Sequence, residues 1–142
     1  MDVDRQRRIS AVLDTNVLLG VMRHRLILFA GLGVYQLVTS KYIIDEVQRI
    51  MAELRWGRAG AEAQIQAILL AAELVDEQVI TGGNYDLWLH DPADHPIMAT
   101  AIAGRVDYLV TQDLKDFPPK QRFAGTTIIT PEAFLRLLAP ED

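Results

Sequence analysis

The chain has 142 residues, of which 50% are hydrophobic and 23% charged, with no cysteine and a net charge of −5. This length is enough for one domain with its own core, and the composition excludes an intrinsically disordered chain. The lack of cysteine excludes disulfides, iron–sulfur clusters and thiolate zinc sites. No apolar run approaches the roughly 20 residues that span a bilayer, and no signal core follows the charged residues 1–10. We therefore expect a cytoplasmic protein that does not associate with membranes.

The negative charge bears on nucleic-acid binding. Proteins that hold nucleic acid by charge neutralisation alone are usually basic. An acidic protein can still act on a phosphodiester when its carboxylates bind divalent cations, because these ions reverse the local sign of the field. The net charge of −5 therefore favours a metal-dependent enzyme over a passive binding protein.

Short apolar runs alternate with helical patterns along the chain. We predict strands at residues 9–14, 35–39, 78–80, 107–111 and 126–130. We predict helices at 17–32, 41–55 and 59–74, a further helix that follows a loop at 91–96 and ends near 104, and a last one at 131–138. Apolar strands that are separated by helices indicate a parallel sheet covered on both faces. The prediction is one three-layer α/β/α domain over residues 1–142, with a parallel sheet of about five strands.

Two acidic residues fall at the carboxyl ends of predicted strands. Asp14 closes the first strand, and Asp113 follows the strand at 107–111. In an open parallel sheet, ligands bind beyond these strand ends. A carboxylate beside buried strand residues is costly unless it is paired or holds a cation, and no Lys or Arg is adjacent to Asp14 in the sequence. The alternative is that Asp14 only caps the helix predicted to begin near Val17.

The pattern of the helix at 41–55 places Glu46. The apolar residues of this helix form one stripe, and at about 100° per residue Asp45 lies opposite the stripe while Glu46 lies at its edge. Glu46 is therefore expected at the border of the core, near the end of the second strand. An ordinary glutamate at the core boundary fits this pattern equally well.

Asp94 precedes the helix that ends near residue 104. Ile97 and Ala101 lie three and seven residues later and share its face, so Asp94 is expected to point inward. The alternative is that Asp94 caps this helix, with Pro96 in the first turn.

The candidate acids come from four separate elements and offer only oxygen ligands: Asp14, Glu46, Asp94 and Asp113. Such a set suits Mg²⁺ or Mn²⁺ and suits zinc poorly. The three histidines show no metal-ligand spacing, and His95 is expected at the rim of the site. No phosphate-binding glycine loop and no nucleophile-elbow serine is present. The pattern predicts an acidic site for a hard divalent ion.

These residues resemble the PIN-domain family over about residues 11–138. The matching pieces are Val12–Val17, Ser40 with Glu46–Val47, Asp91–Asp94, Asp107–Asp113 and Ile128–Phe134. The last piece is similar to the ending of single-domain PIN proteins, many of which are toxins of toxin–antitoxin pairs (VapC-like). Each piece alone is moderately specific, but the ordered set is strong.

The resemblance implies a metal-dependent endoribonuclease that hydrolyses RNA phosphodiesters and is the toxin of a toxin–antitoxin pair. It implies that the four acids are the catalytic residues and the ligands of Mg²⁺ or Mn²⁺. Asn16 and Thr111 would be polar neighbours that shape the site, and Asp116 would be an extra acid serving a second ion. The implied partners are an RNA substrate and an antitoxin protein. A homodimer is also expected, and the apolar residues of the helix at 59–74 could form a dimer or partner interface as easily as part of the core.

RNA binding by an acidic protein needs local positive charge. The candidates for RNA contacts are Arg23, Arg25, Lys41 and Lys115, with Arg49, Lys120 and Arg122 as further cations near the predicted site. For any single one of these residues, a solvated surface cation is the simpler interpretation.

Two other classes of function remain open. One is a phosphatase of the same fold class with Asp14 as nucleophile, although the haloacid-dehalogenase pattern has a second Asp two positions later, where this chain has Asn16. The other is a non-enzymatic interaction module, in which the acids are helix caps and solvated edge residues. Trapping of an acyl-phosphate would support the first class, and failure to bind Mn²⁺ would support the second.

Overall fold

The computed structural model describes residues 8–81, 95–113, 122–123 and 125–139. In this part of the chain the strands are β1 (Ser10–Leu13), β2 (Gln36–Ser40), β3 (Ala72–Val75), β4 (Tyr108–Val110), β5 (Arg122–Phe123) and β6 (Thr126–Ile129). The helices are α1 (Thr15–Leu18), α2 (Arg23–Gly31), α3 (Lys41–Glu53), α4 (Arg58–Ala71), α5 (Gln78–Thr81), α6 (His95–Ala103) and α7 (Pro131–Leu138).

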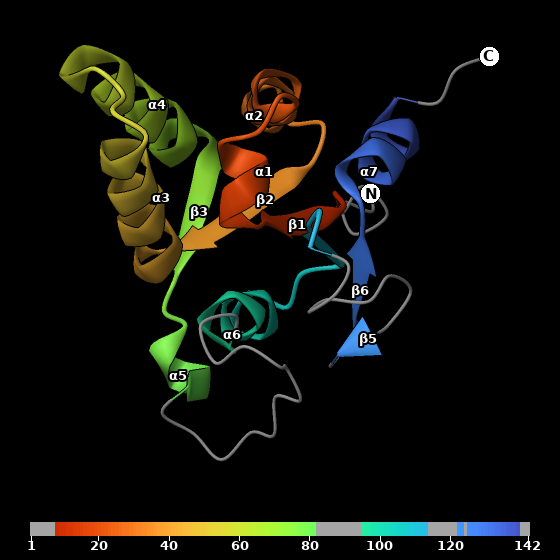
Figure 1. Cartoon of the computed structure of the whole chain (residues 1–142). Helices are drawn as coiled ribbons and strands as arrows, with labels where there is room; N and C mark the ends of the chain where they lie inside the picture. Colours follow the sequence, from red (N-terminus) through yellow and green to blue (C-terminus); the bar gives the residue numbers. More distant parts are fainter. Residues whose placement is uncertain (1–7, 82–94, 114–121, 124, 140–142) are drawn as a thin grey trace.

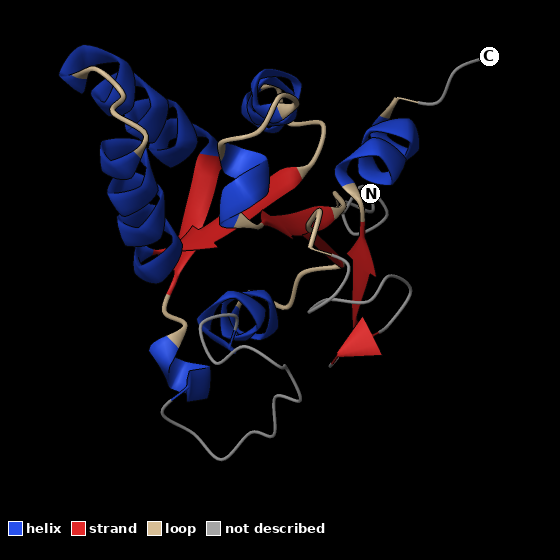
Figure 2. Cartoon of the chain, in the orientation of Figure 1, coloured by secondary structure: helices blue, strands red, loops and turns tan. Residues whose placement is uncertain are grey.

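The strands form one sheet in the order β3-β2-β1-β4-β6-β5. The first five are parallel, and the short β5 pairs antiparallel with β6 at the edge. Helices cover both faces of the sheet, with α6 on one side and α2 and α7 on the other (Figure 1, Figure 2). The prediction of an α/β domain with a parallel sheet of about five strands is confirmed. The antiparallel β5 was not predicted.

The core explains why the central strands carry apolar residues on both faces of the sheet. All four residues of β1 are buried, because the sheet is covered on both faces there. Tyr35, just before β2, packs edge-on against Phe134 of α7 with ring centroids 5.1 Å apart. At the end of α6, a Cβ on Gly104 would lie 2.7 Å from Val38 Cγ1, so only glycine allows this helix to pack so closely on β2. These contacts join the helical layers to the strands that carry the site.

The prediction of a single helix at 17–32 is wrong. The chain forms α1 and α2 instead, separated at residues 19–22. Gly20 lies in this break, where a Cβ would be 2.8 Å from the Asn16 carbonyl oxygen. Helix α1 also begins earlier than predicted, because the Asp14 side chain caps it. The break allows the chain to turn from α1 toward α2.

The helix predicted at 59–74 is confirmed as α4, but it ends three residues earlier than predicted, and the prediction of a strand at 78–80 is wrong. Residues 72–75 form the parallel strand β3 beside β2, and residues 78–81 form the short helix α5. The helical spacing of apolar residues continues by chance into β3, where Leu74 is 56% exposed. At α5, the Gln78 backbone N–H donates to the Asp76 carboxylate at 3.0 Å, which is a side-chain turn that favours helix initiation.

Two predicted helix starts are confirmed. The Ser40 hydroxyl caps α3 by accepting from the Ile43 N–H at 3.4 Å, and Pro131 is the first residue of α7. Within the described ranges, none of the helices combines the length and the apolar character that crossing a membrane requires.

Candidate metal centre

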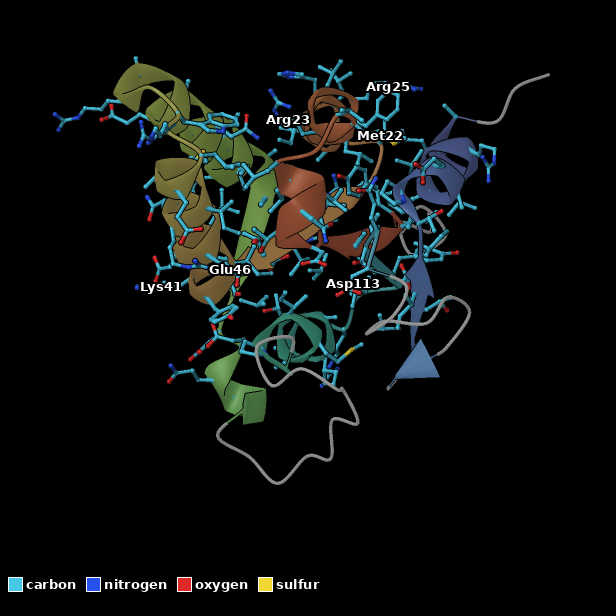
Figure 3. All side chains as sticks on the ribbon, viewed as in Figure 1. Met22, Arg23, Arg25, Lys41, Glu46 and Asp113 are labelled. Atoms are coloured by element: carbon cyan, nitrogen blue, oxygen red, sulfur yellow. The ribbon has the colours of Figure 1, made fainter. Side chains whose placement is uncertain are left out.

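Three of the four predicted acids lie in the described part of the chain, and the topology brings them to one edge of the sheet. Asp14 follows β1, Asp113 lies beyond β4, and Glu46 is in the second turn of α3, which begins directly after β2. Strands β2, β1 and β4 are parallel neighbours, so their carboxyl ends meet. The charges of Glu46 and Asp113 both act on Asp14, and Figure 3 shows these two residues reaching the same region from α3 and from the end of β4.

Asp14 is buried, with 4% of its surface exposed. The Thr15 backbone N–H donates to Oδ1 at 2.7 Å, while the Thr111 hydroxyl and the Asn16 amide donate to Oδ2 at 2.7 and 3.3 Å. Burial raises the pKa of Asp14 from 3.8 to about 6, because desolvation outweighs the hydrogen bonds from Thr111 and Thr15. The negative charges of Glu46 and Asp113 contribute a smaller part of this rise.

Thr111 connects Asp14 with Asp113. Its hydroxyl donates to Asp14 and accepts from the Asp113 backbone N–H at 2.9 Å. Thr111 is fully buried, so its rotamer is held by packing as well as by these two hydrogen bonds. The sequence-based expectation that Asn16 and Thr111 adjoin the acids agrees with these contacts. Their effect on activity stays a prediction.

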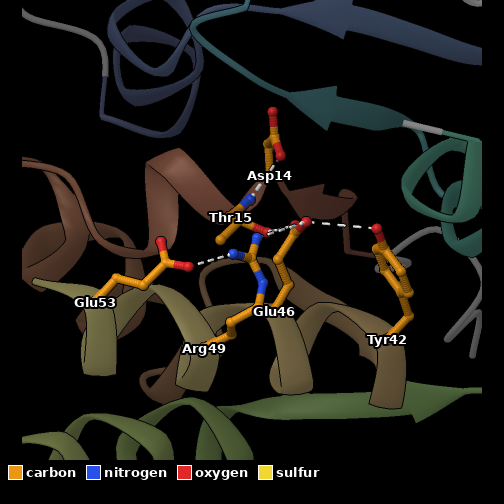
Figure 4. A network of polar contacts seen from close by, with 6 residues as sticks. All are labelled: Asp14, Thr15, Tyr42, Glu46, Arg49 and Glu53. Atoms are coloured by element: carbon orange, nitrogen blue, oxygen red, sulfur yellow. Dashed lines mark hydrogen bonds and ion pairs between the residues drawn. The ribbon is translucent and has the colours of Figure 1, made fainter. Parts of the chain in front are cut away.

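Glu46 is oriented by a network that Figure 4 shows. The Thr15 hydroxyl donates to Glu46 Oε1 at 2.6 Å. The Tyr42 hydroxyl donates to Oε2 at 3.4 Å, and the Arg49 guanidinium lies 3.9 Å from the same oxygen. Arg49 pairs more closely with Glu53, at 2.7 Å, and is 58% exposed, so it screens Glu46 only weakly. Thr15 thus contacts both acids, Asp14 through its backbone and Glu46 through its side chain.

The charge balance of this region fits a cation. Within the described residues, none of the groups that act on the pKa of Asp14 is a cation, and its hydrogen-bond donors are all neutral. A buried carboxylate beside two further carboxylates is costly without an opposite charge. A divalent ion would relieve both the desolvation and the repulsion, and carboxylate oxygens are ligands that Mg²⁺ accepts.

The described residues do not complete such a site by themselves. No group of three or more Asp, Glu or His side chains among them is arranged to hold a metal ion. The predicted acids Asp94 and Asp116 and the predicted RNA contact Lys115 lie outside the described residues. Asp94 directly precedes His95, the first residue of α6. In Figure 1, helix α6 is seen below α1.

The other predicted RNA contacts lie on two helices. Lys41, at the start of α3, is exposed and pairs with Asp45 at 2.7 Å. On α2, Arg23 donates to the Gly20 carbonyl at 3.1 Å and lies 5.4 Å from the centroid of the Trp56 ring, so its guanidinium is engaged within the fold. Figure 3 places both Arg23 and Arg25 on α2, apart from Glu46 and Asp113. RNA contact by these cations stays a prediction.

Two residues of this region, Tyr42 and Thr15, were not predicted from the sequence. Tyr42 is four residues before Glu46, a spacing that places two side chains on one helix face, and this signal could have identified it. Thr15 has no such signal, because its bond to Glu46 joins residues 31 positions apart in different elements.

Comparisons with known proteins agree with this fold. A family model described as PIN domain matches residues 10–115, from β1 to just beyond Asp113. A chain in the crystal structure of VapBC2 from Rickettsia felis bound to a DNA fragment from their promoter is similar in fold, with a TM-score of 0.57 and 17% identity over 86% of this chain and 98% of that one. No curated protein matches the sequence. Since the family model covers more than half of the residues and contains the four predicted acids, the chain belongs to the PIN domain family.

Proposed function

We propose that this chain is a metal-dependent nuclease that hydrolyses RNA phosphodiester bonds. PIN domains are generally nucleases. The observation that carries the proposal is the Asp14 carboxylate, which is buried beside Glu46 and Asp113 and has no cation partner in the described part of the chain. A phosphodiester-cleaving enzyme needs such an electronegative pocket to hold its ion.

The proposed ligands of Mg²⁺ or Mn²⁺ are Asp14, Glu46, Asp113 and Asp94. When bound, the ion supplies positive charge to the phosphate and lowers the pKa of a water. The task of the protein is to hold the carboxylates in place before the ion arrives. Thr15 and Thr111 do this through short hydrogen bonds, so little reorganisation is needed on binding. Asp116 is proposed as an extra acid for a second ion.

We further propose that the chain is a single domain over residues 1–142 and the toxin of a toxin–antitoxin pair, acting in the cytoplasm. The support is the fold similarity to a chain of VapBC2 and the family match. Its partners would be an antitoxin protein and a second copy of itself. Exposed leucines offer surfaces for such contacts: Leu28 on α2, Leu32 directly after α2, and Leu70 on α4.

The test is cleavage of a labelled RNA panel in the presence of Mn²⁺, of Mg²⁺ or of EDTA. The unmodified protein should cleave with either ion and not with EDTA, and Asp14→Asn should be inactive. Glu62→Gln is the matched control, because Glu62 is an exposed acid on α4. Cleavage that persists in EDTA, or in the Asp14→Asn variant, would refute the proposal.

A further inference from the structure

An open cavity of about 630 Å³ lies beside the candidate metal centre. It is formed by the first turns of α3, the end of β3 and the start of α5. These are the carboxyl-terminal ends of the strands at the β3 side of the sheet, where parallel α/β proteins bind ligands. The proposed chemistry of the metal centre does not use this cavity.

Glu77 is the unusual residue in its lining. It is only 8% exposed, no described residue donates a hydrogen bond to it, and its charge acts on the Lys41 ammonium. Among the described residues, the polar side-chain atoms that are buried without a partner do not include the Glu77 oxygens, so its carboxylate still reaches water. Its oxygens are therefore acceptors available to a group that enters the cavity.

The charges around Glu77 restrict what could enter. Among the described residues of the lining there are three carboxylates, those of Asp45, Asp76 and Glu77, and one ammonium, that of Lys41. Lys41 is fully exposed and makes its ion pair with Asp45. An anion such as a phosphate is repelled by this balance, whereas a group that presents N–H donors is favoured.

One side chain joins the cavity to the metal centre. Tyr42 lines the cavity, and its hydroxyl donates to Glu46 Oε2 at 3.4 Å (Figure 4). When the scissile phosphate of an RNA lies at Asp14, Glu46 and Asp113, a neighbouring nucleotide of that RNA is therefore within reach of this cavity. The ring of Tyr42 offers an aromatic surface, which is how proteins commonly hold unstacked bases of single-stranded RNA.

We propose that this cavity is a nucleobase subsite in which Glu77 accepts hydrogen bonds from the base edge of a guanine next to the cleaved bond. This inference rests on the proposed nuclease function. Guanine is the base that presents two adjacent donors, N1–H and the 2-amino group, on one edge, and these match the two oxygens of a carboxylate. Uracil presents one donor between two carbonyl oxygens, which the carboxylates would repel.

The test uses short RNAs in which each guanine flanking the mapped cleavage site is replaced in turn by inosine, which lacks the 2-amino group. At one position, inosine should lower kcat/KM of the unmodified protein about tenfold or more, as for loss of a bidentate base contact. Glu77→Gln should still cleave but should no longer distinguish guanine from inosine at that position. Glu62→Gln should keep the discrimination. The RNA substitution needs no protein variant, so the first result does not depend on how Glu77→Gln folds.

The subsite is refuted if the unmodified protein cleaves the guanine and inosine RNAs equally at every flanking position. It is also refuted if the discrimination persists in Glu77→Gln, or if the preferred base at the sensitive position is uracil. Failure of the unmodified protein to cleave any RNA with Mn²⁺ is a different result. It would overturn the proposed function, and the subsite with it.

Discussion

Replacing Thr15 by valine would remove one hydroxyl group from the candidate site and keep a side chain of similar shape. That hydroxyl lies 2.6 Å from Glu46 Oε1, and Thr15 is 4% exposed, so water has little access to replace it. The backbone N–H of Thr15 would still donate to Asp14. The substitution therefore removes the hydrogen bond to Glu46 and leaves the one to Asp14 in place.

The expected loss follows from the charge on the acceptor. A hydrogen bond to a charged group contributes about 1.5–3 kcal/mol, and about 1.4 kcal/mol is a factor of ten. If Glu46 is needed in the transition state, kcat/KM for RNA cleavage should fall roughly 10- to 150-fold in Thr15→Val. Thr15→Ser keeps the hydroxyl and should restore most of the activity.

A matched control is available on the opposite side of β4. Thr126 is fully buried, and its hydroxyl donates to the Val106 carbonyl at 2.8 Å. Thr126→Val should lower the free energy of unfolding but leave cleavage by the folded protein unchanged. Equal activity losses in Thr126→Val and Thr15→Val, or full activity in Thr15→Val, would show that the reasoning about Glu46 is wrong.

Three further outcomes are expected. The folded-state pKa of Asp14, about 6, lies above 3.8, so its contribution to the stability of the metal-free fold is present below about pH 4 and is lost as pH rises through 6. Metal-free Asp14→Asn should therefore unfold at a higher temperature than the unmodified protein at pH 7.5, with up to about 3 kcal/mol gained. Mn²⁺ should raise the Tm of the unmodified protein by calorimetry but not that of Asp14→Asn. Gly104→Ala should cost about 1–3 kcal/mol in denaturant unfolding because of the contact with Val38, whereas Gly60→Ala, where nothing lies within 4 Å, should be neutral or stabilising.

The fold could be predicted where the apolar pattern and the burial agree. The residues of β1 and β2 are almost all buried, so their uninterrupted apolar runs have one interpretation. In β3 the two end residues are half-buried and the two central residues are exposed, and the strand follows α4 without a break. When the spacing of apolar residues continues from a helix into a half-exposed edge strand, the sequence contains no signal for the end of the helix. The boundary between α4 and β3 at Ala72 could therefore not be predicted.

The acids of the site could be predicted because parallel strands place their carboxyl ends together. Asp14 and Asp113 needed only the strand pattern, and Glu46 needed the helical angle within α3. The residues that orient them depend on contacts between elements, such as the bond from Thr15 to Glu46 and that from Thr111 to Asp14. These contacts follow from how α1, α3 and β4 meet, which no local pattern in the sequence records.

The two interpretations of Asp14, helix cap and metal ligand, turn out to be compatible, and their energetics favour the second as the reason for an aspartate here. Oδ1 caps α1, but α1 is only four residues long, and an uncharged asparagine or serine would cap it as well. A cap does not explain why a charge is placed among buried residues with Glu46 and Asp113 beside it, where its pKa rises to about 6. Such an arrangement destabilises the metal-free fold at neutral pH, and a bound cation is what would reverse that cost.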